Sequence, residues 1–226
     1  MKQIDFENGK ITDNILRASV PMLVAEVLSL LYNIVDRIYI ARIPDVGTTA
    51  LGSVGLCFPI ITIILAFSNL FGSGGAPLFS ITRGAGDDEE AGRILGNSFT
   101  LLLCFGVLLT AVGLLFKTPV LRLLGASDAT LPYADAYLTI YLLGSIFVSL
   151  SLGLNSFINA QGFARTGMLT VAIGAVLNLL LDPLFIMVLG MGVQGAALAT
   201  VLSQAVSAAW TFRFLTGRHT LVRLSP

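Results

Sequence analysis

The chain has 226 residues, of which 55% are hydrophobic and 12% are charged, and its mean hydropathy is +0.88. Soluble domains carry about 25% charged residues, so this composition excludes an ordinary soluble domain and indicates a membrane protein. The formal net charge is zero, which argues against nucleic acid as a partner. The two cysteines lie in apolar runs and are too few for a disulfide framework.

Residues 1–14 mix acidic and basic side chains and precede the first apolar run. No small-residue cleavage site follows that run, so it is typical of a retained membrane anchor and not of a removable signal peptide. We therefore expect residues 1–14 to form a cytoplasmic N-terminal segment.

Six stretches reach the length of about 20 apolar residues that a helix needs to cross a membrane. They are residues 15–40, 50–80, 91–116, 131–156, 166–189 and 193–215. The second is longer than one crossing and contains glycines and Pro77, which predicts a bend. The segment after Lys117 predicts a short helix at the membrane surface. The expected fold is an all-α polytopic membrane protein with a six-helix transmembrane region at 15–215.

The distribution of Lys and Arg between the loops predicts the orientation of the chain, since cytoplasmic loops carry the excess. Four basic residues fall on one side, namely Arg37, Arg42, Lys117 and Arg122. Nine fall on the other, namely Lys2, Lys10, Arg17, Arg83, Arg93, Arg165, Arg213, Arg218 and Arg223. Both termini are therefore expected in the cytoplasm, with residues 216–226 as a cytoplasmic C-terminal segment.

Three carboxylates, Glu26, Asp36 and Asp182, lie well inside the expected spans, and Asp135 lies near the start of the fourth span. A carboxylate at the centre of a membrane helix costs roughly 2.5–3.5 kcal/mol on insertion scales. Such residues usually face a bundle interior or an aqueous cavity and mark ion or proton pathways. For Asp36, simple pairing with a neighbouring arginine such as Arg37 is the plain alternative.

The polar residues of three spans fall at similar depth. At about 1.5 Å per residue, Asp36, Asp182 and Thr200 lie roughly 7–12 Å below the outer surface. Tyr32 precedes Asp36 by four residues and Asn178 precedes Asp182 by four, so each pair shares a helix face. The sequence therefore predicts that these five side chains converge.

Such a group of oxygen atoms suits a hard cation such as Na⁺. The two carboxylates could instead carry a proton, and spacing does not choose between the two ions. Pro183 leaves a carbonyl one turn earlier without its usual donor, which adds a backbone oxygen. Glu26 lies about 15 Å deeper than Asp36, where it pairs with a helix neighbour or forms a second protonatable site.

Several separate motifs, in order, resemble the N-terminal lobe of the multidrug and toxic compound extrusion (MATE) transporters over nearly the whole chain. They are VPMLVAEVLSLLYNIVDRIYIARI at 20–43, SGGAPLFSITRGAGDDEEAGR at 73–93, NAQGFARTGM at 159–168 and NLLLDPLF at 178–185. The resemblance implies a cation-coupled antiporter, driven by Na⁺ or H⁺, that exports amphipathic and cationic organic compounds.

Carried onto this sequence, the family's cation or proton site falls on Asp36, Asn178, Asp182 and Thr200, with Tyr32 lining it. This chain departs from the family pattern in three ways. Glu26 stands where members commonly carry an uncharged polar residue, and the outer YIARIP segment lacks the usual glycines. Members also have twelve helices in two lobes, whereas this chain stops where the linker to the second lobe should begin.

The implied partners are therefore an organic cation, membrane lipids, and a second MATE-like lobe or a second copy of this chain. No cofactor is expected beyond the coupling ion. Two other hypotheses about function remain. One is a flippase for lipid-linked saccharides, which the scarcity of Lys and Arg in the spans disfavours; the other is a truncated, non-transporting lobe that acts as a membrane interaction protein.

An enzyme is not expected. The single histidine, His219, lies in the basic C-terminal segment, and no Gly-x-Ser-x-Gly, His-Glu-x-x-His or Cys/His cluster occurs. The expected location is a prokaryotic plasma membrane.

Overall fold

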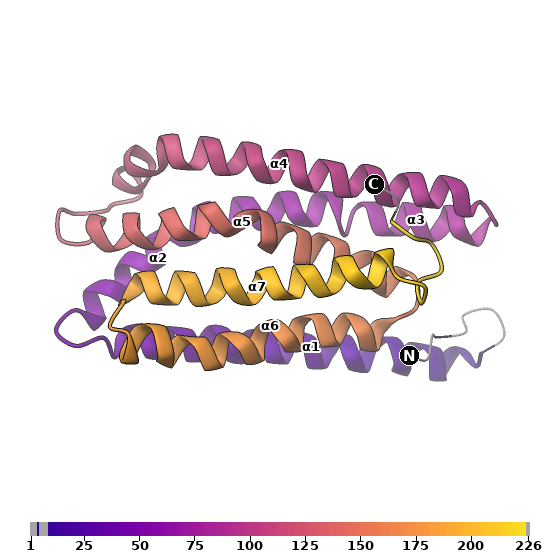
Figure 1. Cartoon of the computed structure of the whole chain (residues 1–226), viewed down its shortest axis with the longest axis horizontal. Coiled ribbons are helices and arrows are strands. Elements are labelled where there is room, and N and C mark those ends of the chain that lie inside the picture. Colours follow the sequence, from indigo (N-terminus) through magenta and orange to yellow (C-terminus); the bar gives the residue numbers. More distant parts are fainter. Residues whose placement is uncertain (1–3, 5–8, 225–226) are drawn as a thin grey trace.

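The computed structural model describes residue 4 and residues 9–224, and within these it is all-helical (Figure 1). The α-helices are α1 (Ile11–Ala41), α2 (Gly47–Phe71), α3 (Gly75–Gly84), α4 (Asp88–Leu123), α5 (Leu131–Ala160), α6 (Ala164–Asp182) and α7 (Val193–Thr216), and a π-helix, η1 (Pro183–Val188), follows α6 directly. With α2–α3 and α6–η1 each counted as one crossing, the described residues supply six helices long and apolar enough to span a membrane. The predicted fold class is confirmed.

The second crossing bends where its glycines predicted. Gly72 separates α2 from α3, and it lies so close to α5 that a Cβ atom there would be 2.5 Å from the Cα of Gly153. Helices in lipid approach this closely only through small residues. The bend and the α2–α5 contact therefore depend on the same glycine.

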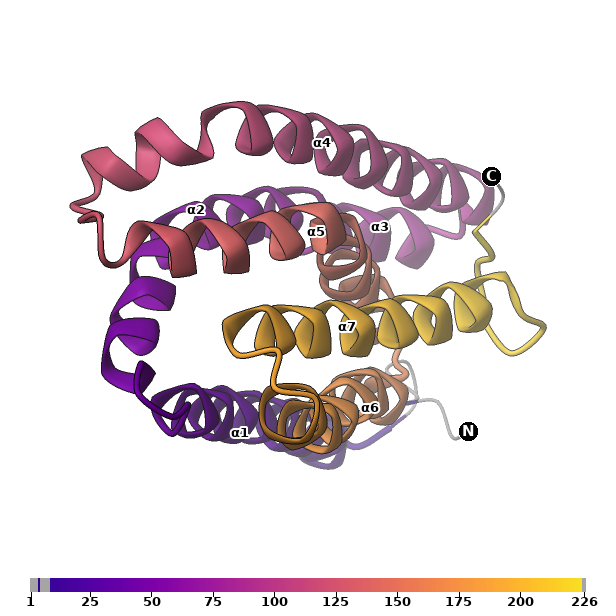
Figure 2. The ribbon, with the colours of Figure 1, turned by 60° about the vertical axis from the view of Figure 1, so that its left-hand side comes forward.

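The helix expected at the membrane surface after Lys117 is not a separate element. This segment continues α4 to Leu123, with Pro119 inside the helix, and the last turns of α4 swing away from its main axis (Figure 2). Proline removes one backbone hydrogen bond and bends a helix without ending it. The prediction was right about helical structure and wrong about the break.

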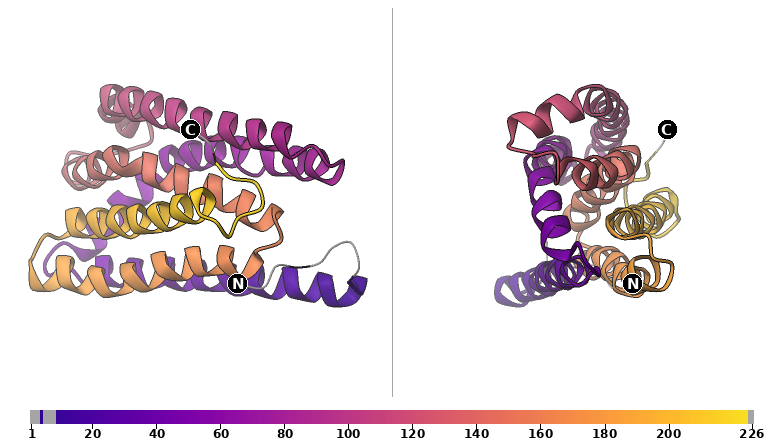
Figure 3. Two further views of the ribbon diagram at one scale, coloured as in Figure 1. Left: turned by 45° about the vertical axis from the view of Figure 1, so that its right-hand side comes forward. Right: turned by 90° about the vertical axis from the view of Figure 1, so that its left-hand side faces the viewer.

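Helix α5 is the centre of the lobe, because it packs against α2, α4 and α7. In the end-on view of Figure 3, α4 lies at the top and α1 with α6 at the bottom, with α5 between them. Helix α1 is a peripheral element that packs mainly on α6. One core cluster contains Ile40, Tyr137 and Ile186 at the end far from the termini, and a second contains Phe79 and Phe157 near them.

Six crossings bring both described ends of the chain to the same end of the bundle (Figure 1). This arrangement agrees with a shared side for both termini, and the cytoplasmic side stays a prediction from charge. Lys2, which contributed to that prediction, lies outside the described residues. Helix α1 begins at Ile11, so the end of the expected N-terminal segment, residues 1–14, is already helical.

The chain after α7 folds back onto the turn between α5 and α6. The fully buried side chain of Gln161 accepts hydrogen bonds at Oε1 from Thr220 Oγ1 (2.7 Å), Leu221 N (2.9 Å) and Val222 N (3.1 Å). Its Nε2 donates to the carbonyl of Val222 at 3.2 Å. Val222 and Leu224 are buried in the core cluster nearest the termini. Within the expected C-terminal segment, residues 220–224 thus pack against the lobe.

Replacing Gly72 by alanine should lower the melting temperature of the purified protein. The added methyl would overlap the backbone of Gly153, and overpacking of this kind costs about 1–3 kcal/mol. Gly55→Ala is the matched control on the same helix, since nothing lies within 4 Å of a Cβ there. Equal melting temperatures for the two variants would contradict the close α2–α5 approach.

Gln161→Leu should release the segment at 220–224 from the lobe. The substitution leaves two buried or half-buried backbone amides without their acceptor, at a cost of about 1–3 kcal/mol each. Hydrogen exchange measured by mass spectrometry should show faster exchange in this segment, while Gln194→Leu, at an exposed site on α7, should not. Unchanged protection in the Gln161 variant would show that the buried side chains alone hold the segment.

Candidate cation-binding site

The site is built where α6 changes into a π-helix. Asn178 and Asp182 lie one turn apart at the end of α6, and Pro183 begins η1. Proline has no N–H for the α-helical ladder, and the amide of Leu189 bonds the carbonyl of Leu184, five residues earlier, at 2.9 Å. Turns of π-helix inside longer helices are frequent at functional sites. The interruption of the α-helical hydrogen-bond pattern that Pro183 predicted is therefore present at this position.

Asn178 joins α6 to α7. Its Nδ2 atom lies 3.4 Å from Asp182 Oδ1 and 3.3 Å from Thr200 Oγ1, and the Thr200 hydroxyl donates to the carbonyl of Ala196 at 3.1 Å. Asn178 is 1% exposed and Asp182 is fully buried, while Thr200 is half-buried. One amide thus holds a carboxylate and a hydroxyl of two helices together.

Asp36 brings α1 to the same place. Its carboxyl group interacts electrostatically with that of Asp182 and lies within reach of a shared hydrogen bond. Among the described residues Asp36 forms no ion pair, and the guanidinium of neighbouring Arg37 instead lies 4.6 Å from the ring centroid of Phe58 on α2. The structure therefore brings together Asp36, Asn178, Asp182 and Thr200.

Three oxygens of this cluster lack donors. Asp36 Oδ1, Asn178 Oδ1 and Asp182 Oδ2 are buried and have no hydrogen-bond partner among the described residues. Buried polar atoms are nearly always satisfied, so an orphaned group calls for an explanation such as an ion. Carboxylate and amide oxygens suit a hard monovalent or divalent cation, and a carboxylate pair also suits a proton. The donor set thus fits either coupling ion.

Aromatic hydroxyls surround the cluster. Tyr32 of α1 is half-buried beside Asp36, as predicted from their spacing. Tyr137 of α5, 5% exposed, interacts electrostatically with both carboxylates of the site. Tyr141 stacks on Tyr137 with ring centroids 6.2 Å apart. Sequence reasoning missed the two α5 tyrosines, although their spacing of four residues within a span was the same signal that selected Asn178 and Asp182.

Glu26 does not join this cluster. It is exposed at the middle of α1, and among the described residues no ion pair or side-chain hydrogen bond involves it. Pairing with a helix neighbour, one of its two expected roles, is not what the structure shows.

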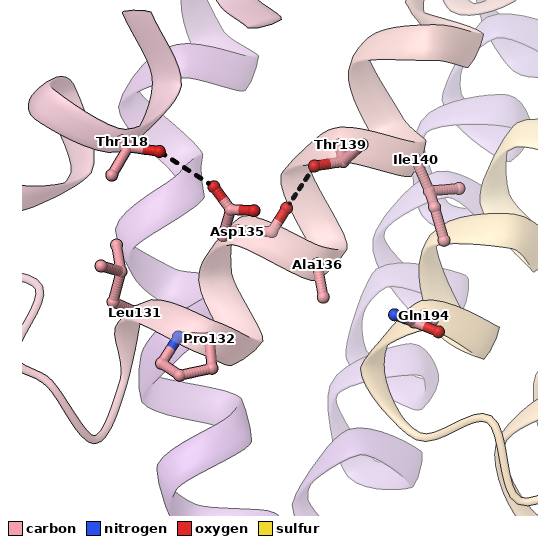
Figure 4. A pocket seen from close by; sticks show the side chains of 8 residues that line it. All are labelled: Thr118, Leu131, Pro132, Asp135, Ala136, Thr139, Ile140 and Gln194. Carbon is pink, nitrogen blue, oxygen red and sulfur yellow. Dashed lines mark hydrogen bonds between the residues drawn. The ribbon is translucent and has the colours of Figure 1, made fainter.

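A second polar pocket lies between the ends of α4, α5 and α7 (Figure 4). It has a volume of about 520 Å³ and is lined by Thr118, Leu131, Pro132, Asp135, Ala136, Thr139, Ile140 and Gln194. Lys117 Nζ lies 2.6 Å from both Asp135 Oδ2 and Thr139 Oγ1, and Thr118 donates to Asp135 Oδ1 at 3.2 Å. This carboxylate already has its cation, so the pocket is less suited to a coupling ion than the pair Asp36 and Asp182.

Comparison with known proteins shows the family of the chain. Residues 21–184 match the model of the MatE family. The chain is 31% identical over 202 residues to the multidrug export protein MepA of Staphylococcus haemolyticus, covering 89% of this chain and 44% of that protein. It is 30% identical over 227 residues to the probable multidrug resistance protein YpnP of Bacillus subtilis, covering 100% and 50%.

Solved structures give the same result. A multidrug resistance MATE family transporter of the MOP superfamily, in an outward-facing conformation, superposes with a TM-score of 0.91 at 30% identity, covering 100% of this chain and 49% of that chain. This chain thus spans about half the length of the relatives it matches. These relatives are multi-span membrane transporters, and the bacterial origin of the two curated proteins is consistent with the plasma membrane. The chain belongs to the MatE family of multidrug and toxic compound extrusion transporters, and its fold is one six-helix half of theirs.

Proposed function

We propose that this chain is one lobe of an antiporter that couples inward movement of Na⁺ or H⁺ to export of amphipathic organic cations. The observation that carries the proposal is the set of three orphaned buried oxygens of Asp36, Asn178 and Asp182. The names of the similar proteins, which describe multidrug export and multidrug resistance, support an exporter.

Ion binding can be coupled to a movement of α1 because the two carboxylates belong to different helices. Asp36 belongs to the peripheral helix α1, and Asp182 belongs to α6, on which α1 packs. Two charged carboxylates repel each other, whereas a cation between them or a shared proton attracts both. An ion can shift a conformational equilibrium only if it binds one state more tightly. Ion binding therefore favours the state in which α1 lies against α6, and ion release permits another position of α1.

A second lobe would complete the transport path. Transporters built from repeats hold substrate at the interface between the repeats, and this chain supplies one six-helix unit. The partner in this proposal is a second MATE-like lobe or a second copy of this chain, and a closed pair of identical lobes would be related by a two-fold axis. Membrane lipids would cover the remaining apolar surface, such as the exposed side chains of Leu23, Leu31 and Ile38 on α1.

Vesicles that contain only this chain should export a fluorescent organic cation when a Na⁺ or H⁺ gradient is imposed. Asp182→Asn should reduce the gradient-driven rate by about tenfold or more, because it removes one of two charges on which coupling depends. Asp128→Asn is the control with the same chemical change, since the Asp128 side chain is 95% exposed in an outer loop. The gradient that drives efflux identifies the coupling ion.

The outcomes separate the parts of the proposal. Efflux that is lost in Asp182→Asn and kept in Asp128→Asn supports a self-assembling half-transporter. Equal rates in both variants would overturn the assignment of the coupling site. Absence of efflux from folded, correctly inserted protein would overturn transport by this chain alone and leave the non-transporting lobe.

A further inference from the structure

A polar strip runs along α1 beside the cation site. At about 100° per residue, Ser19, Glu26, Asn33 and Arg37 fall within an arc of about 40° on the helix surface. Glu26, Asn33 and Arg37 are exposed, and Ser19 is half-buried. Glu26 is the midpoint of the helix, which runs from residue 11 to residue 41. The strip therefore places one carboxylate halfway across the membrane.

The rest of the exposed surface of α1 is different in character. Beyond the first turn of α1, the neighbouring arc, about 120° wide, is entirely apolar. It carries the exposed side chains of Leu16, Val20, Leu23, Val24, Val27, Leu30, Leu31, Ile34 and Ile38. On the opposite flank of the strip, Pro21 and Ala25 are buried. Helix α1 thus has a buried side, a side suited to lipid, and a polar strip that separates the two.

Contacts at the outer end show where the strip points. Arg37, a member of the strip, stacks on Phe58 of α2, so the strip is directed toward α2. Helices α1 and α2 are adjacent at their connection and diverge from there (Figures 1 and 2). Deeper in the membrane, the strip keeps this direction, along the side of α1 that is turned toward α2.

The face of α2 beside Phe58 is also polar or small. Exposed residues recur there at alternating spacings of three and four: Gly52, Gly55, Pro59, Thr62, Ala66 and Asn69, and Ser73 continues the series just beyond the end of α2. The exposed Leu70 is the large apolar residue on this face. The hydroxyl of Ser73 lies 3.3 Å from that of Ser156 on α5. Of the charged groups on these two faces, Glu26 is the only carboxylate, and Arg37 lies eleven residues away, about 16 Å along the helix.

An unpaired carboxylate facing lipid at this depth would cost roughly 2.5–3.5 kcal/mol. Residues of this kind face water-filled cavities and mark substrate paths. We propose that Glu26 is the recognition carboxylate for the positive charge of the exported organic cation, with Asn33 and the small residues of α2 beside it. Substrate and coupling ion then occupy separate places on one helix, about 15 Å apart. The identity of the ligand as the exported compound rests on the proposed function.

Exposure to water is tested first. In a chain whose Cys57 and Cys104 are replaced by alanine, Glu26→Cys should react with a charged, membrane-impermeant thiol reagent in vesicles. Val27→Cys is the matched control, because its side chain points about 100° away into the apolar arc and should not react. Equal reactivity at both positions, or reaction at position 27 alone, would overturn the water-facing strip.

Recognition is tested by binding, without any gradient. Tetraphenylphosphonium should bind the purified full chain in lipid nanodiscs, and Glu26→Gln should weaken that binding about tenfold or more, the scale of one charge-assisted contact. Asp13→Asn, the same change of charge near the start of α1, should leave the affinity unchanged. Absence of binding to the unaltered chain, or less than a twofold effect of Glu26→Gln, would overturn the proposal. Loss of binding in Glu26→Gln supports it even if the vesicle assay shows no efflux.

Discussion

Two carboxylates held close together inside a membrane, with no ion pair to either among the described residues, are the constraint on which the rest of this lobe depends. Asp182 is fully buried, and its neighbour Asp36 arrives from a different helix. Burying charge is costly unless it is paired, so the pair is stable only with a proton or a cation. Because a bound cation or proton lowers the free-energy cost of burying the two carboxylates, the stability of the site depends on ion binding.

The packing of the helices directs the effect of ion binding to α1. Helices α2, α4 and α7 are held by α5, whereas α1 packs mainly on α6. The contact between α1 and α6 contains the carboxylate pair, and the π-helical turn after Pro183 loosens the regular backbone beside it. A change of charge at the site therefore acts on a peripheral helix that packs mainly on one neighbour. The same helix carries Glu26, which links the ion site to the face proposed for substrate.

Much of this could be predicted from the sequence, because the membrane imposes simple rules. Length and hydropathy predicted six crossings, and depth along straight helices brought Asp36, Asn178, Asp182 and Thr200 to one level. Features that depend on packing between distant segments were not accessible. Tyr137 and Tyr141 share a helix face within a span, but only the packing of α5 shows that this face meets the two carboxylates. The Gln161 contacts join residues about 60 apart, which no local pattern reveals. The segment after Lys117 was expected to be a separate short helix, but α4 continues through it to Leu123.

The most direct measurement is the uptake of Na⁺ and protons by the purified chain as the pH is varied, with radioactive Na⁺ and a pH-sensitive readout in parallel. The same measurement on Asp36→Asn and Asp182→Asn isolates the contribution of the pair. We expect that the unaltered chain takes up a Na⁺ ion, a proton, or one in exchange for the other, and that each substitution removes this uptake. Equal uptake by the unaltered chain and both variants would contradict the assignment of the coupling site.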